Sequence, residues 1–209
     1  MKITHITARL CVLVGLVLAI GALAVLAAPP TARAAPETPT IVKFNGQSAV
    51  AEFDTVSGGV ETFVLVAGTQ PSGASSPQVV VVVGQFDVTT GTTLLFASGS
   101  TSTAMVQFGP NLSSATASAT VLLTDSVSGG SFSVAVNVGW TASAPLIHQN
   151  NTTVSHTTGF TSVFHSNAGL RDANASGTVS DGTTNFTPSP SVLAQILRVN
   201  SAQITITHT

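Results

Sequence analysis

The chain has 209 residues, a formal net charge of −2, and charged side chains at only 7% of its positions. Nucleic-acid binding needs a patch or groove of clustered Lys and Arg side chains, so this composition excludes nucleic acid as a partner.

The N-terminal segment has the order of a secretory signal peptide. A basic start precedes an uncharged apolar run from Leu10 to Ala28, and Ala32-Arg33-Ala34 then forms a small-x-small cleavage pattern. We therefore predict a signal peptide over 1–34 and a flexible Pro-rich stretch over 35–42, and hence a secreted or cell-surface protein. Because the apolar run is just long enough to span a bilayer, an uncleaved N-terminal anchor is the alternative.

Cleavage changes the composition of the remaining chain. The only cysteine, Cys11, is removed, so the β domain expected over 43–209 contains no disulfide. From Ala35 onward there are 24 Ser and 27 Thr among 175 residues, which favours strands and turns. The same stretch has three basic and eight acidic residues, and three minus eight gives a net charge of −5. We expect no nucleic acid as a partner, and no membrane insertion after cleavage.

Hydrophobic periodicity predicts an all-β fold. Residues 132–140 alternate apolar and small or polar side chains, as in a strand with one buried face, and this pattern buries Trp140. Val79 to Val83 are apolar without alternation, which indicates a central strand covered on both faces. Further short apolar stretches between turn residues predict a β-sandwich of Ig-like or jelly-roll type with about ten short strands. Ser191–Asn200 fits a helix or a strand, and the following "QITIT" favours the strand.

Three acidic loops repeat the pattern Asp-x-x-Ser/Thr-Gly, beginning at Asp54, Asp87 and Asp125. An Asp side chain accepts bonds from backbone N–H groups two or three residues on, and Gly adopts positive φ, so each loop is interpreted as a hairpin turn. The alternative is calcium, which takes about six to eight oxygen ligands, whereas each loop offers one carboxylate. The first and last loops lie 71 residues apart, and the apolar faces after them are predicted to correspond, as in a duplicated hairpin or in two similar turns of one sandwich.

The other titratable residues form no recognisable site. A hairpin is expected to bring His156 and His165 across from each other, but two histidines without a third ligand make a poor zinc site. Glu52 and Glu61 flank the first turn and are the one carboxylate pair considered for glycoside hydrolysis. No G-x-S-x-G motif is present. We predict no catalytic, cofactor-binding or metal-binding residues, and no cofactor.

Two stretches carry a resemblance to known proteins. "NASGTVSDGTTNFTPSPS" (Asn174–Ser191) and "SATVLLTDSVSGGSFSVAVNVGWT" (Ser118–Thr141) resemble a group of uncharacterised exported bacterial β-rich proteins. The resemblance implies secretion and a β fold, and it transfers no functional residue. We expect a non-enzymatic extracellular or cell-surface structural or interaction module with a protein or surface glycan as partner. The alternative is a small-ligand or carbohydrate-binding module, with a hydrolase third.

Overall fold

The computed structural model describes residues 40–73, 76–157 and 160–208. These residues are all-β, as the sequence predicts, and the predicted signal peptide (1–34) lies outside them. The ten strands are β1 (Thr40–Ser57), β2 (Val60–Pro71), β3 (Gln78–Asp87), β4 (Thr93–Thr101), β5 (Ala104–Phe108), β6 (Ser114–Asp125), β7 (Ser131–Ala142), β8 (Ile147–Thr157), β9 (Phe160–Ser180) and β10 (Leu193–His208). Within the described residues, the one helical element is the 3-10 turn η1 (Pro110–Leu112), and no helix is long and apolar enough to cross a membrane.

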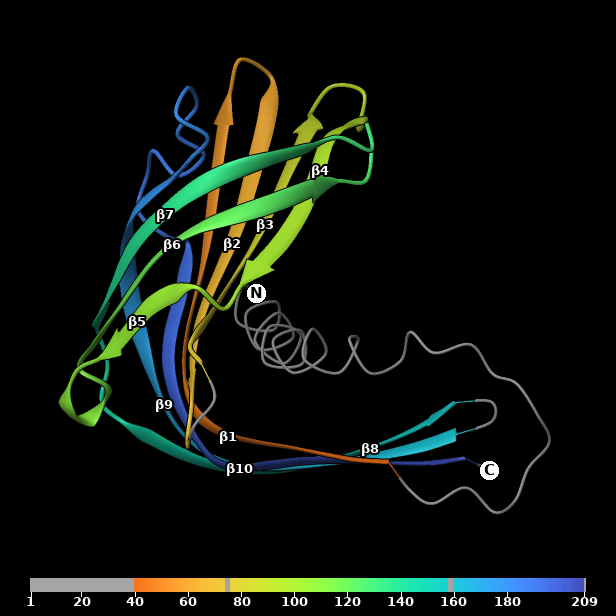
Figure 1. The fold of residues 1–209 in the computed structure, drawn as a ribbon, viewed down its shortest axis with the longest axis vertical. Helices are drawn as coiled ribbons and strands as arrows, with labels where there is room; N and C mark the ends of the chain where they lie inside the picture. Colours follow the sequence, from red (N-terminus) through yellow and green to blue (C-terminus); the bar gives the residue numbers. More distant parts are fainter. Residues whose placement is uncertain (1–39, 74–75, 158–159, 209) are drawn as a thin grey trace, which may run out of the picture.

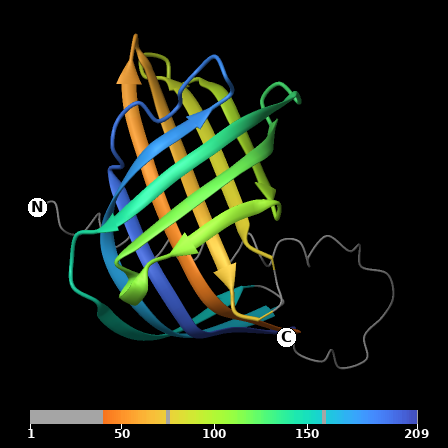
Figure 2. The ribbon, with the colours of Figure 1, turned by 60° about the vertical axis from the view of Figure 1, so that its left-hand side comes forward.

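All ten strands belong to one antiparallel sheet. In its order, β10-β1-β2-β3-β4-β6-β7-β9-β8, most strands lie beside the strand that precedes or follows them in the chain. A further pairing between β9 and β10 closes the sheet into a ring, and β5 pairs with β6 beside it. Figure 1 and Figure 2 show β5, β6 and β7 crossing over β1, β2 and β3, so that two parts of the same sheet face each other.

The predicted sandwich type is not confirmed. Ig-like and jelly-roll sandwiches hold their strands in two sheets connected by Greek keys, whereas here a single sheet curves until its two ends pair. The disulfide-free prediction is consistent with the sequence, because the chain has one cysteine only. The assignment of Ser191–Asn200 to a strand is confirmed, since β10 begins at Leu193.

The inside of the ring is the main hydrophobic core. Inward side chains from β1, β2, β3, β6, β7, β9 and β10 pack there, and the largest of them is Trp140. Trp140 is 1% exposed, as predicted, and its indole Nε1–H donates to the carbonyl oxygen of Val50 across the ring at 3.0 Å. One side chain therefore fills the core and links β7 to β1 through a buried hydrogen bond.

A second apolar cluster lies on the outer face of the same strands. Successive residues of a strand point to opposite faces, so Val50 faces away from its core neighbours Ala49 and Ala51. Val50 packs with Leu65 on β2 and with other outward side chains of β2 and β3. Valines of β3 belong to both clusters, namely Val79, Val81 and Val83 inside and Val80 and Val82 outside. The prediction of a central strand at Val79–Val83 is confirmed by its place between β2 and β4; on its outer face Val80 is buried and Val82 half-buried.

The ring has one narrow seam, between β4 and β6. Their register contains only the pairs Ala97–Asp125 and Ser98–Thr124. One residue further along, a Cβ on Gly99 would lie 2.0 Å from the carbonyl oxygen of Leu122. The two backbones therefore approach each other as closely as glycine alone allows.

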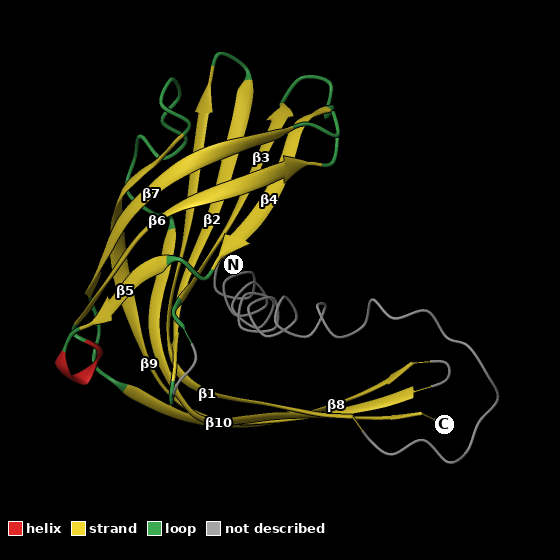
Figure 3. Ribbon diagram, in the orientation of Figure 1, coloured by secondary structure: helices red, strands yellow, loops and turns green. Residues whose placement is uncertain are grey.

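At the end of the ring opposite the β1–β2, β3–β4 and β6–β7 turns, four strands continue outward as an arm. The arm consists of β8 with the paired ends of β9, β10 and β1, as Figure 3 shows. Where it leaves the ring, the β1–β10 register shifts between Phe44 and Gly46, and the β10–β9 register shifts between Val199 and Ser201. These bulges mark the boundary between the closed ring and the open arm.

Candidate functional site: a polar pocket where the arm leaves the ring

Two of the three repeated acidic loops are hairpin turns braced by their aspartate, as predicted. Asp87 Oδ1 accepts the N–H groups of Thr89 and Thr90 at 2.8 and 2.9 Å, and Gly91 follows with φ of 69°. The backbone N–H groups of Thr90 and Thr89 hold the pKa of Asp87 below its usual value. Oδ1 of this carboxylate thus braces its own turn.

Asp125 does more than brace its turn. Its carboxylate accepts the N–H groups of Val127 and Ser128 and the Ser128 hydroxyl, all within the loop. It also accepts the N–H of Phe96 on β4 at 3.1 Å, while Ser126 N–H donates to the Phe96 carbonyl at 2.9 Å. The Ser128 hydroxyl, followed by the Val127 N–H, lowers the pKa of Asp125 to about 2. This aspartate therefore also fastens the narrow β4–β6 seam.

Asp54 does not brace a turn, so that prediction is wrong. Ser57 pairs with Val60, and the β1–β2 turn is the two-residue loop Gly58-Gly59, with φ of 59° and 80°. Positive φ at both central residues is the geometry of a tight hairpin turn that Gly-Gly favours. Asp54 lies inside the strand opposite Phe63, and its buried Oδ1 has no hydrogen-bond partner.

The apolar faces after the two loops do not correspond either. Val134 and Val136 point into the main core, whereas Phe63 and Leu65 belong to the outer cluster. The predicted equivalence of these positions is therefore wrong by one residue, which exchanges the two faces of a strand. The structural equivalent of the Asp125 loop is the Asp87 loop.

Neither the histidines nor the glutamates gather into a site. His165 lies opposite Thr152, whose Oγ1 is 2.9 Å from His165 Nδ1, and His156 lies opposite Thr161. The expected hairpin is present, but its register does not pair the two histidines. Glu52 lies opposite Leu65, while Glu61 lies opposite Val56, so four residues or about 13 Å of strand separate the glutamates. Glycosidase carboxyl groups lie about 5–9.5 Å apart.

Among the described residues, no group of three His, Cys, Asp or Glu side chains is placed to hold a metal ion. The calcium alternative for the acidic loops therefore has no geometric support there. Asp181, at another turn, likewise accepts the N–H groups of Thr183 and Thr184 at 2.8 and 2.7 Å. Asp87, Asp125 and Asp181 thus each accept backbone N–H groups of their own turns, whereas Asp54 does not.

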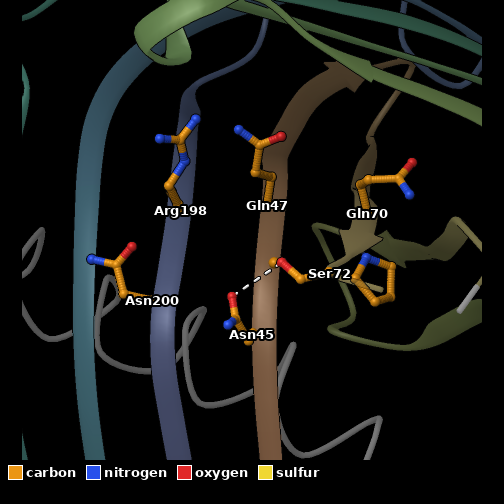
Figure 4. A pocket seen from close by; sticks show the side chains of 8 residues that line it. Asn45, Gln47, Gln70, Ser72, Arg198 and Asn200 are labelled. Atoms are coloured by element: carbon orange, nitrogen blue, oxygen red, sulfur yellow. Dashed lines mark hydrogen bonds between the residues drawn. The ribbon is translucent and has the colours of Figure 1, made fainter. Parts of the chain in front are cut away.

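The structure instead reveals a polar pocket at the base of the arm. Its cavity volume is about 330 Å³. Three neighbouring strands, β10, β1 and β2, and the residue after β2 form its wall. The lining residues are Asn45, Gly46, Gln47, Gln70, Pro71, Ser72, Arg198 and Asn200. In Figure 4 the side chains of Arg198 and Gln47 extend side by side from adjacent strands, and the Gln70 side chain lies on the far side of Gln47.

The strand register explains why these side chains converge. Gln47 lies directly opposite Arg198 on one side and Gln70 on the other. Residues directly opposite each other share a face of the sheet, so the three form one row across three strands. The face is that of the core residues Ala49 and Ile196, which occupy the next row inward. The pocket therefore begins where the apolar core ends.

Gly46 brings β1 close to the end of β2 beside this row. A Cβ at Gly46 would lie 2.4 Å from the carbonyl oxygen of Gln70 and 2.8 Å from the Cα of Pro71. Since both are backbone atoms, no side-chain rotation relieves the contact. The absence of a side chain at Gly46 is thus a condition for the shape of the pocket wall.

The outer rim of the pocket is a chain of amides. Asn200 Nδ2 donates to Asn167 Oδ1 at 2.7 Å, and Asn167 Nδ2 donates in turn to Asn150 Oδ1 on β8. On the other side, the Ser72 hydroxyl donates to Asn45 Oδ1 at 3.1 Å. These bonds orient the amides, so the Asn45 amide group presents its N–H donors and Asn200 presents its carbonyl oxygen.

Sequence reasoning missed this pocket, although a signal for it exists. On each of the three strands, the apolar face ends in a long polar side chain: Gln47 after Ala49 and Ala51, Arg198 after Ile196, and Gln70 after Val66 and Gly68. One such position is ordinary in a strand. Only the register shows that the three positions are neighbours.

Comparison of the chain with protein-family models, curated proteins and solved structures found no match. The function therefore has to be argued from the pocket itself.

Proposed function

We propose that this chain is a secreted, non-enzymatic binding module and that the pocket at the base of the arm takes a small polar ligand. One observation carries the proposal: six polar side chains from adjacent strands surround a cavity of about 330 Å³. Such a volume falls in the range of small-molecule sites, and a few placed polar groups orient the ligand in them.

The chemistry of the lining supports binding rather than catalysis. Amides, a hydroxyl and a guanidinium donate and accept hydrogen bonds, but none of them is a general base near neutral pH. Hydroxyl-rich molecules such as sugars offer the complementary donors and acceptors. The signal-peptide pattern of residues 1–34 supports an extracellular location for this binding.

Thermal-shift measurements on the mature protein, with millimolar glucose, glucuronate or sulfate, test this proposal. At least one probe is expected to raise the melting temperature, because a ligand that binds only the folded state stabilises it by mass action. The double variant Gln47→Ala/Gln70→Ala should lose the shift, since it removes two of the three side chains of the central row. Gln107→Ala, an exposed glutamine on β5, is the matched control and should keep it. No shift with any probe, or a shift that survives in the double variant, contradicts the proposal.

A second candidate function, protein interaction through a strand edge, is favoured by β8. This strand is the last in the sheet order, so one of its edges has no partner strand in the described part of the chain. It contains no Lys, Arg, Asp, Glu or Pro and no bulge, which are the features that commonly protect an edge. Val154→Lys places a charge at an exposed site of β8 and should abolish self-association in sedimentation. A wild type that stays monomeric at every concentration would exclude pairing between copies.

A further inference from the structure

The three basic residues that follow Ala35 are far apart in sequence but lie on neighbouring strands in or near the pocket. From Ala35 onward the chain has only Lys43, Arg171 and Arg198. Arg198 lines the pocket, and Arg171 lies opposite Ile196, one row further into the ring. Lys43 lies opposite Gln203, in the arm. Three adjacent strands, β9, β10 and β1, thus carry all three residues within a few rows of each other.

The acidic residues lie elsewhere. Asp87 and Asp125 end β3 and β6, and Asp181 follows β9; Figure 1 shows these strand ends at the end of the ring away from the arm. The nearest acidic residue in the β9–β10 register is Asp172, which accepts the Gln195 amide at 2.9 Å. Odd and even positions of a strand point to opposite faces, so this pair lies on the face away from Arg198.

In the described part of the chain, the pocket offers Arg198 no counter-charge. No acidic residue lines the pocket, and no described residue makes a hydrogen bond or ion pair with the Arg198 guanidinium. Arg171 is also incompletely paired, since its Nε is buried without a hydrogen-bond partner. Along one inner face the described residues thus hold Arg198 in a pocket without an acidic residue and Arg171 with a buried, unsatisfied Nε.

The orientation of the Asn45 amide adds to this positive potential, whereas Asn200 presents its carbonyl oxygen. Asn45 Oδ1 is occupied by the Ser72 hydroxyl, so the N–H groups of Asn45 remain for a ligand. Gln47 and Gln70 supply further N–H donors beside the guanidinium. A guanidinium presents two parallel N–H donors that match the two oxygens of a carboxylate or sulfate.

We propose that the ligand of this pocket carries an anionic oxygen group, a carboxylate or sulfate, which Arg198 binds through its paired N–H donors. This inference rests on the proposed binding function and specifies its ligand class. An acidic sugar and a free inorganic anion share this chemistry. The surrounding amides fit the hydroxyl groups of the sugar, whereas a free anion uses the arginine and its nearest donors alone.

Titration calorimetry on the mature protein with glucuronate, glucose and sulfate tests the inference. Glucuronate should bind more tightly than glucose, and added salt should weaken its binding. Arg198→Gln should lower the affinity for glucuronate about tenfold to a hundredfold, because it removes a charge-assisted hydrogen bond. Arg198→Lys keeps the charge but not the paired donors and should lie between the wild type and Arg198→Gln. Circular dichroism of each variant checks that the sheet is intact.

The outcomes separate this inference from the proposed function. If sulfate binds as tightly as glucuronate, and if both lose affinity equally in Arg198→Gln, the anion site is supported. The ligand is then a free anion rather than an acidic sugar. Glucose and glucuronate binding equally, unaffected by Arg198→Gln, overturns the anionic ligand class but leaves a polar-ligand pocket. Binding of none of the three probes overturns both.

Discussion

The hairpins β1–β2 and β6–β7 are built around nearly the same six residues, Asp54–Gly59 and Asp125–Gly130, and they fold differently. In the first, the strands continue to Ser57 and Val60 and a Gly-Gly turn joins them. In the second, the strand ends at Asp125, whose carboxylate organises a longer loop. The difference lies in the neighbours: Val88 N–H, next to β3, donates to Gly59, whereas β4 donates to Asp125. Tertiary contacts select between two turns that the local sequence permits.

The contact between β4 and β6 supports the Asp125 loop, so a substitution there should disturb the β6–β7 hairpin and leave the β1–β2 hairpin in place. Gly99→Ala puts a methyl group 2.0 Å from the Leu122 carbonyl oxygen, and the strands must separate. We expect the largest effect here, a loss of about 2–3 kcal/mol of unfolding free energy, since overpacking against backbone cannot be relieved by a rotamer change. Urea unfolding measures it. Gly139→Ala on β7 is the matched control, because nothing lies within 4 Å of its new Cβ, and it should cost nothing.

Replacing the two aspartates sharpens the comparison directly. Asp125→Ala removes the acceptor for three N–H groups and one hydroxyl, so it should be clearly destabilising, though less so than Gly99→Ala. Asp54→Ala removes a carboxylate whose buried Oδ1 has no partner and should change the unfolding free energy by no more than about 0.5 kcal/mol. Thermal melts of both variants give the answer. Equal losses would mean that the two aspartates play the same role after all.

The fold was predictable from the sequence to the level at which local periodicity operates. Alternation at 132–140 and the valines of β3 indicated the strands, their buried faces and the burial of Trp140. The closure of the sheet was not predictable, because it depends on the pairing of β9 with β10 and on a seam of two residue pairs. The pocket was hidden for the same reason, since Gln47, Gln70 and Arg198 become neighbours only through the register.

Low pH should remove the contribution of ionised Asp125 to the unfolding free energy. Its pKa is lowered to about 2 in the folded protein, against about 3.9 for an unperturbed Asp. A lowered pKa means that ionised Asp125 stabilises the fold above about pH 4, and that this contribution is lost as the pH falls through about 2. Asp125→Asn should therefore be less stable than the wild type near neutral pH, and the gap should close at low pH. Unfolding free energies of both proteins across this range measure it, and a constant gap would show that charge is irrelevant.

The smallest expected effect is that of calcium on the melting temperature. This measurement tests whether any acidic loop binds a metal ion in addition to forming a turn. Asp87 Oδ1 and both carboxylate oxygens of Asp125 already accept backbone N–H groups. A calcium ion would have to displace those bonds and find several further oxygens, and each loop offers one carboxylate. For each of the wild type, Asp87→Asn and Asp125→Asn, the melting temperature measured with calcium should therefore equal the one measured with chelator. A calcium-dependent rise in the wild type that either variant abolishes would show that the loop concerned binds metal and that its turn geometry is secondary.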